Sequence, residues 1–286
     1  MGKIIACLDG SAHADSVAGL GAWAAVRTGL EVALLHVAAP HSDRAADGDF
    51  SGQIGLGAKS ELLEELARVD EERGKLEQQK GQIILSHARS VLAEAGVSKS
   101  ETLHRRGALV ETIAELEADA ELIIIGKRGE NAASAPTHLG SNLERVIRAV
   151  HTPLLVTPRQ LHPAMRRFLV AYDGSASSRK AVDYIAANPL LQGLDCHLLM
   201  VAEPGGDADG ALAEASDKLT AAGFSVQASV RAGKSVDVVV NAYVAEAAID
   251  LLVMGAYGHS KIRSLLLGST TTAQILNAAV PVLLFR

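Results

Sequence analysis

A glycine-rich segment near the C-terminus has the composition of a phosphate-binding loop. Gly255 and Gly258 follow the apolar run DLLVM, nine residues separate Gly258 from Gly268, and Ser269 and Thr270 then begin the helical pattern TTAQILNAA. Glycines let the backbone approach a phosphate, and a helix N-terminus offers free N–H donors and a positive dipole end. The alternative is that these glycines serve only turns and a helix start.

An aspartate stands at the end of another apolar run. Asp173 follows RFLVAY, and a carboxylate there accepts hydrogen bonds, which suits ribose hydroxyls or an amino group of adenine better than phosphates. In open parallel sheets, ligands bind beyond the carboxyl ends of the strands, where the strand order reverses. We therefore expect the loops after the first and fourth strands to form a site.

The chain contains an internal repeat that places these residues on strands. Five segments recur in the same order, and each pair combines a β-rich apolar run with similar flanking residues. The pairs are 3–16 with 167–180, 31–37 with 196–202, 105–113 with 231–239, 121–129 with 250–258, and 152–158 with 280–286. We therefore predict two domains, residues 1–158 and 166–286, joined by a short proline-containing link.

Each domain has the pattern of an α/β fold. Near-continuous apolar strands alternate with amphipathic helical segments, which indicates parallel strands with both faces of the sheet covered. We predict two tandem doubly wound domains, each with a five-stranded parallel sheet of Rossmann-like type. A chain of 286 residues is long enough for two cores of ordinary size.

The first copy is longer, and the surplus corresponds to residues 41–80. This segment begins as a loop rich in Gly, Asp and Ser and continues as KSELLEELARVDEERGKLEQQK, whose mixed charges and leucine spacing favour an exposed helix. The helix could simply extend the normal crossover between two strands. It could also be a lid or a surface for a partner, and the sequence leaves both readings open.

At the glycine loop the chain resembles the universal stress protein family, whose ATP-binding members carry Gly-x2-Gly-x9-Gly-(Ser/Thr) after the fourth strand. The resemblance covers both halves except residues 41–80, and it implies an adenine nucleotide alpha hydrolase-like fold. It also implies that ATP or another adenine nucleotide binds, with or without Mg²⁺. The implied contacts are Asp173 with base or ribose, the backbone of Val201 and Ala202 with adenine, and Met254, Gly255, Gly258, Gly268, Ser269 and Thr270 with ribose and phosphates.

The first half departs from this spacing. Ten residues rather than nine separate Gly129 from Gly140, and this stretch contains Glu130, a proline and no Lys or Arg. Lys127 and Arg128, between the first two glycines, could compensate. Binding in the first half stays open, and its candidate residues are Asp9, Gly126, Gly129, Gly140 and Ser141.

Several other classes of function lack support in the sequence. A net charge of −6 and an aromatic share of 3% argue against nucleic acid as a partner, and no apolar run is long enough to span a membrane. The two cysteines lie far apart, the histidines show no metal-ligand spacing, and no Gly-x-Ser-x-Gly nucleophile motif occurs. Gly233-Lys234-Ser235 lacks the upstream glycine of a P-loop, because Ala228 stands there. Since the first strand begins at Lys3, leaving no room for a signal peptide, we expect a cytoplasmic protein.

Three functions remain. The leading hypothesis, implied by the resemblance, is an ATP-binding stress-response protein that acts as a non-catalytic or very slow ATPase switch or scaffold for an unknown protein partner. A nucleotide-free dimerisation scaffold is the second. An adenylating enzyme on a related fold is less favoured, because the loops DGSAHADS and DGSASSRK are poor in glycine. The apolar last strands, TPLLVTP and VPVLLFR, should pair within the chain or between chains, because unpaired edges promote association.

Overall fold

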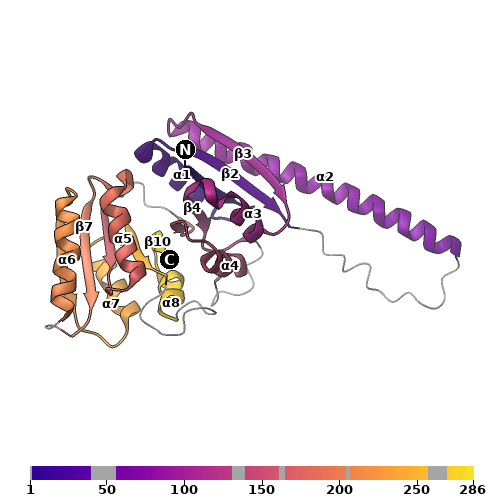
Figure 1. Ribbon diagram of the computed structural model, residues 1–286. Coiled ribbons are helices and arrows are strands. Elements are labelled where there is room, and N and C mark those ends of the chain that lie inside the picture. Colours follow the sequence, from indigo (N-terminus) through magenta and orange to yellow (C-terminus); the bar gives the residue numbers. More distant parts are fainter. Residues whose placement is uncertain (1, 40–55, 131–138, 161–164, 204–206, 257–268) are drawn as a thin grey trace.

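The computed structural model describes residues 2–39, 56–130, 139–160, 165–203, 207–256 and 269–286, with the backbone alone at 56–63, 207 and 269. Its helices and strands alternate along both halves, as the repeat predicts (Figure 1). The first half contains β1 (Lys3–Leu8), α1 (Ala14–Thr28), β2 (Glu31–Ala38), α2 (Leu56–Glu94), β3 (Ser100–Arg106), α3 (Leu109–Leu116), β4 (Ala120–Gly126), α4 (Ser141–Ala149) and β5 (Leu154–Thr157).

The second half repeats this order with shorter connections. It contains β6 (Arg167–Ala171), α5 (Ala176–Ala187), β7 (Asp195–Val201), α6 (Asp207–Ala221), β8 (Val226–Arg231), α7 (Val236–Glu246), β9 (Leu251–Gly255), α8 (Ser269–Asn277) and β10 (Val282–Phe285). A short 3-10 helix, η3 (Pro189–Leu191), precedes β7.

The two halves share one ten-stranded sheet in the order β3-β2-β1-β4-β5-β10-β9-β6-β7-β8. The strands within each half are parallel, which confirms the prediction of two doubly wound α/β units. At the centre β5 and β10 pair antiparallel, with Leu155 opposite Leu283. The last strands therefore pair within the chain, which is one of the two arrangements expected for them.

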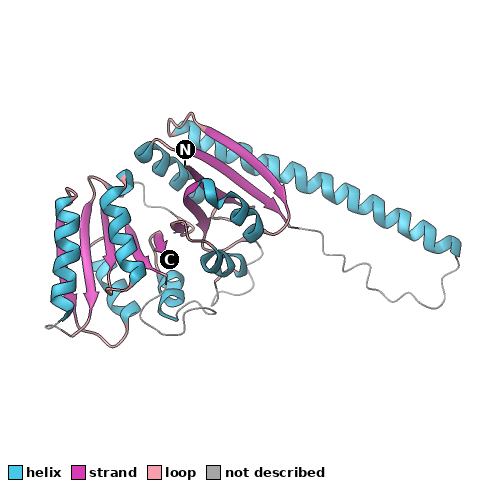
Figure 2. Ribbon diagram, in the orientation of Figure 1, coloured by secondary structure: helices cyan, strands magenta, loops and turns pink. Residues whose placement is uncertain are grey.

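Helices cover both faces of the sheet (Figure 2). Alternate residues of β1 show why: Ile4 and Ala6 belong to the core under α1, α2, α5 and α6, whereas Ile5 and Cys7 belong to the core under α3, α4, α7 and α8. A strand buried on both faces needs apolar residues at every position, which explains the continuous apolar runs of the sequence.

The second strands of the two halves, β2 and β7, correspond with a shift of one residue from the alignment that the sequence suggests. Cys7 faces Leu35 in the parallel register of β1 and β2, and its counterpart Ala171 faces Leu199. Val37 therefore corresponds to Val201, not to Ala202. The error arose because the apolar runs of these buried strands look alike when shifted by one residue.

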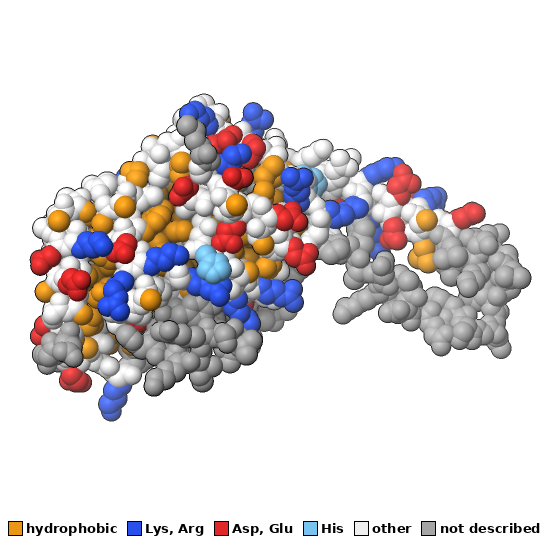
Figure 3. Space-filling view, in the orientation of Figure 1, with side chains coloured by type: hydrophobic (Ala, Val, Ile, Leu, Met, Phe, Trp, Pro, Cys, Tyr) orange, Lys and Arg blue, Asp and Glu red, His pale blue; other side chains and the backbone are white. Residues whose placement is uncertain are grey.

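The extra segment of the first half includes most of a long helix. Residues 56–80 are continuous with the crossover helix, so that α2 is a single helix of 39 residues that projects beyond the sheet (Figure 1). Positive and negative side chains are interspersed along its projecting part and over the face of the body seen in Figure 3. This supports the reading of a solvated extension of the crossover, while a role for its surface remains a question of function.

Candidate functional site

The strand order reverses at β6 in the second half, since β6 lies between β7 and β9. Ala171 is in register with Leu199 on one side and with Met254 on the other. The carboxyl ends of these three strands therefore bring Asp173, Val201 and Gly255 to one edge of the sheet. Asp173 is exposed, whereas Val201 and Gly255 are partly buried. This is the edge at which open parallel sheets bind their ligands.

The aspartate is held in a tight turn. Its Oδ1 accepts a hydrogen bond from the backbone N–H of Ser175 at 3.0 Å, and Gly174 between them has a left-handed φ of 72° that glycine adopts without strain. Ser175 then caps α5 by accepting from the N–H of Ser178. The turn thus fixes the Asp173 carboxylate at the start of α5.

Gly255 lies directly against the first turn of α5. A Cβ at this position would stand 2.3 Å from Oγ of Ser177 and 3.2 Å from the backbone nitrogen of Ser178. Only glycine allows β9 to approach α5 so closely. This close approach narrows the distance between the aspartate turn and the end of β9.

The helix that would hold phosphates is anchored beside the same strand. α8 begins at Ser269, Thr270 is exposed in its first turn, and Thr271 donates its hydroxyl hydrogen to the carbonyl oxygen of Ala256 at 2.9 Å. Met254 is buried and Ala202 partly buried beside this edge. Gly258 and Gly268 lie outside the described residues, so the middle of the predicted loop stays a prediction.

The equivalent edge of the first half carries its aspartate in the same kind of turn. Asp9 accepts from the N–H of Ser11 at 3.0 Å, as Asp173 does from Ser175, but its second oxygen also accepts from the N–H of Glu130 at 3.0 Å. A Cβ on Gly129 would lie 2.9 Å from that same carboxylate oxygen. The loops after β1 and β4 are therefore joined directly through Asp9.

The inserted helix reinforces this closure. Nζ of Lys80 on α2 lies 2.5 Å from Oε1 of Glu130, and both side chains are partly exposed. The contact raises the pKa of Lys80, chiefly through its hydrogen bond to Glu130. Residues 56–80 thus contact the loop that carries the first glycines of the weaker motif.

Lys127 does not point toward a ligand at the first edge. Its amino group donates to the carbonyl oxygens of Leu276 and Ala278, at the C-terminal end of α8 in the second half. Burial, with a smaller effect of the neighbouring Arg128, lowers its pKa to about 8. The expectation that Lys127 could compensate for the altered motif is not met in this arrangement.

Gly126, Gly140 and Ser141 occupy the expected places around β4 and α4. A Cβ on Gly126 would lie 2.7 Å from Cβ of His13, so this glycine also permits a close approach to the preceding turn. Gly140 is the N-cap residue of α4, and Ser141 is the exposed first residue of that helix. The helix N-terminus needed for an anion is therefore present in the first half.

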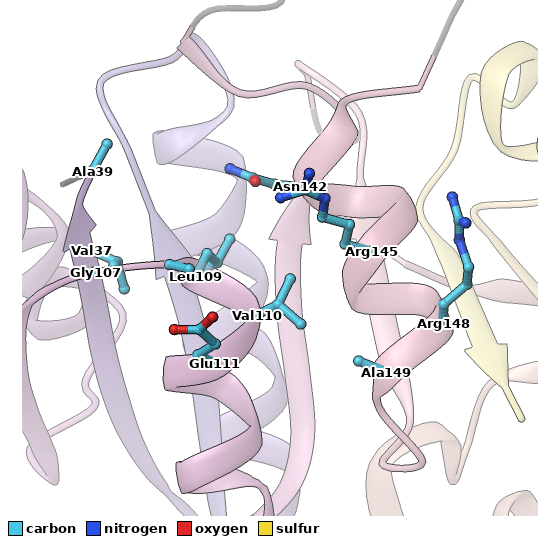
Figure 4. Close-up of a pocket in the computed structure, with 11 residues that line it drawn as sticks. Val37, Ala39, Gly107, Leu109, Val110, Glu111, Asn142, Arg145, Arg148 and Ala149 are labelled. Atoms are coloured by element: carbon cyan, nitrogen blue, oxygen red, sulfur yellow. The ribbon is translucent and has the colours of Figure 1, made fainter. Parts of the chain in front are cut away.

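A groove of ≈ 670 Å³ opens next to this helix in the first half (Figure 4). Val37 and Ala39 lie at the end of β2, Leu109 at the start of α3, and Asn142 and Arg145 on the first turns of α4. Arg145 is exposed and forms no ion pair with the described part of the chain. The sequence interpretation missed this arginine, although its spacing of four residues from Ser141 places both on neighbouring turns of one helix.

Gly233-Lys234-Ser235 lies between β8 and α7, just as Gly107-Ala108 lies between β3 and α3.

Among the described residues, no group of three or more His, Cys, Asp or Glu side chains could hold a metal ion, and no helix could cross a membrane.

The sequence matches the universal stress protein family over residues 1–158 and again over residues 165–286. The universal stress protein Slr1230 of Synechocystis sp. strain PCC 6803 is 38% identical to the chain over 289 residues, and the alignment covers 100% of both proteins. The chain belongs to the universal stress protein family.

Solved structures agree on the fold of this universal stress protein. A universal stress protein from Archaeoglobus fulgidus DSM 4304 is similar over 99% of this chain and 98% of its own, with 21% identity and a TM-score of 0.71. The functionally unknown protein PA1789 from Pseudomonas aeruginosa PAO1 is similar over 99% and 92%, with 17% identity and a TM-score of 0.57. The tandem architecture is thus shared along the full chain.

Within this universal stress protein the described parts of the two family motifs can be set side by side. The second half keeps an exposed aspartate beside the glycine at the end of β9. The first half joins its aspartate to the loop after β4 and opens its groove further along, beside α3 and α4. The duplication thus provides two edges whose aspartates differ in exposure.

Proposed function

We propose that this universal stress protein binds an adenine nucleotide, ATP in the first place, at the carboxyl edge of β6, β7 and β9. One observation carries the proposal: Asp173, Val201 and Gly255 meet at the strand-order reversal beside the N-terminus of α8. The aspartate suits the ribose or the adenine amino group, and the helix N-terminus suits phosphates, with or without Mg²⁺.

The motif spacing and the exposure of the aspartate support the choice of the second edge. In the first half the Asp9 carboxylate already accepts from two backbone N–H groups, one of them from the loop after β4. A nucleotide there would have to replace the contact with Glu130 and part the two loops. In the second half the exposed Asp173 adjoins a spacing of glycines that matches the family motif in full.

The proposed role is a switch or scaffold, with at most slow ATP hydrolysis. The residues at the second edge are suited to hold a nucleotide through backbone donors, hydroxyl groups and one carboxylate. A ligand can switch a protein only by binding one conformation more tightly than another, and an unknown protein partner would read the favoured conformation. Two buried, free cysteines suit a reducing compartment, and we place the protein in the cytoplasm.

The test is to identify and titrate the nucleotide. Mass spectrometry of the material released from purified protein should detect an adenine nucleotide, and calorimetry should show ATP binding to the wild type. Gly268→Val should abolish this binding, because the family motif has a glycine at this position and glycine lets the backbone approach a phosphate. Gly140→Val, at the matching position of the first half, is the control and should retain binding at the second half.

The outcomes separate the competing functions. A wild type that binds no adenine nucleotide would favour the nucleotide-free scaffold, and normal binding by Gly268→Val would refute the placement at the second half. If Gly140→Val alone loses binding, the nucleotide belongs in the first half, where the groove beside Arg145 is open. Release of pyrophosphate at steady state would favour an adenylating enzyme.

A further inference from the structure

Lys127 belongs by sequence to one half and by contact to the other. It lies between Gly126 and Gly129 of the first half, and its backbone N–H donates to the carbonyl oxygen of Thr157 at 3.0 Å. Its side chain leaves this loop and reaches the end of α8, where it donates to Leu276 and, at 3.2 Å, to Ala278. Leu276 lies in the last turn of α8, where carbonyl groups have no partner within the helix, and Ala278 follows the helix end.

The antiparallel junction makes this contact possible. Because β5 and β10 run in opposite directions, the carboxyl edge of the first half lies alongside the amino edge of the second. A helix that leads into β10 ends at that amino edge, within reach of a side chain that follows β4. Ala256, the counterpart of Lys127, is a buried residue without a charge, so the contact has no equivalent in the second loop.

The helix that Lys127 anchors is the one proposed to hold phosphates. α8 is attached near its start by Thr271 to Ala256, in its middle by Gln274, whose amide donates to Oδ1 of Asn241 at 2.7 Å, and at its end by Lys127. A cation at the C-terminal end of a helix is stabilised by the helix dipole, as is an anion at the opposite end. A helix of nine residues moves as a unit, so a shift of the end of α8 would also change the direction of the N–H groups in its first turn.

We propose that Lys127, in the altered motif of the first half, is a positioning residue for the phosphate-binding N-terminus of α8 in the second half. This inference rests on the proposed nucleotide site. It assigns the first motif a supporting role. The ammonium group of Lys127 binds the backbone of the second half and thereby increases the affinity of that half for the phosphates of a nucleotide.

Calorimetric titration with ATP and with adenosine tests the proposal. Lys127→Met should weaken ATP binding by about tenfold, which corresponds to one hydrogen bond between a phosphate and the N-terminus of α8 becoming poorly aligned. The same variant should bind adenosine as the wild type does, because adenosine has no phosphate. Lys127→Arg should restore ATP binding to within about twofold, because it keeps a cation that can donate to the two carbonyl groups. Lys127→Gln provides a second neutral variant if the methionine variant does not fold.

Arg27→Met is the matched control for a general weakening of the junction. Arg27 on α1 also crosses between the halves, where it donates to the carbonyl oxygens of Leu190 and Gln192, and it makes no hydrogen bond with the described part of α8. This variant should bind ATP as the wild type does. Equal losses of ATP affinity in Arg27→Met and Lys127→Met, or equal losses for ATP and adenosine, would overturn the proposal.

Hydrogen exchange of ligand-free protein distinguishes this inference from the proposed function. The amides of α8 should exchange faster in Lys127→Met than in the wild type and in Arg27→Met. Unchanged exchange would overturn the anchoring role whatever the protein binds. A wild type that binds no ATP would instead overturn the proposed function, and the predicted effect on affinity with it.

Discussion

Asp9 and Asp173 stand at equivalent positions, and their carboxylates make the same first contact with a backbone N–H two residues later. Asp9 is partly buried and also accepts from the N–H of Glu130, whereas Asp173 is exposed. An Asp-Gly-Ser motif therefore fixes the same kind of turn in both halves.

The glycines around these aspartates can be tested one at a time. Gly255→Ala should destabilise the protein by about 1–3 kcal/mol, because its Cβ would overlap with Ser177 and press on the backbone of Ser178. Gly140→Ala is the control, since the nearest atom to its Cβ would be 3.8 Å away. Urea unfolding measures both changes. Equal stability of the two variants would mean that β9 and α5 are not packed as described.

Much of the second edge followed from the sequence, because strand ends and glycine spacing are local features. The positions of Asp173, Val201 and Gly255 at one edge required only the order of the strands. The direction of Lys127 could not be foreseen, because it depends on the antiparallel meeting of β5 and β10. Long-range contacts of this kind leave no periodic signal in the chain.

At the scale of elements, α2 shows how an insertion can be absorbed without disturbing a fold. Its last turns pack on the sheet through residues such as Leu85 and Leu92, while the added turns before them extend past the sheet and contact Glu130 through Lys80. The helical pattern of residues 59–80 was visible in the sequence. An extension of the crossover helix was one of the two readings of the sequence, although Gly81 at the boundary has a low helix propensity.

Gly81 and Gly74 of α2 should respond in opposite ways to alanine. At Gly81 a Cβ would lie 2.6 Å from Nε2 of His104 and 2.8 Å from Cδ2 of the buried His36, so Gly81→Ala should destabilise the protein despite the better helix propensity. At Gly74 the nearest atom is the end of the Arg106 side chain at 3.3 Å. Gly74→Ala should therefore stabilise α2 by up to about 1 kcal/mol.

Thermal unfolding followed by circular dichroism measures this pair, since both variants keep the charge and length of the helix. A stabilising Gly81→Ala would show that α2 does not pass over the two histidines as described. A destabilising Gly74→Ala would show that the projecting turns are not helical in solution.

At the scale of the whole molecule, the antiparallel junction places the two motif-bearing edges on opposite edges of one sheet. A nucleotide at the second half would thus lie away from the first motif loop. The two are connected by α8, which begins at the second edge and ends at Lys127. The junction also buries the two apolar last strands, β5 and β10, which the sequence predicts to pair. At the centre of the sheet Leu155 is 1% exposed and Leu283 is 0% exposed.

Hydrogen exchange at the two central strands provides the test of this architecture. β5 and β10 are short strands of four residues each. Because β10 is paired with β9 on one side and with β5 on the other, its amides should nevertheless exchange as slowly as those of β9. Fast exchange in both β5 and β10, with slow exchange in β4 and β9, would mean that the halves are separate sheets in solution and that the contact of Lys127 with α8 is lost with the junction.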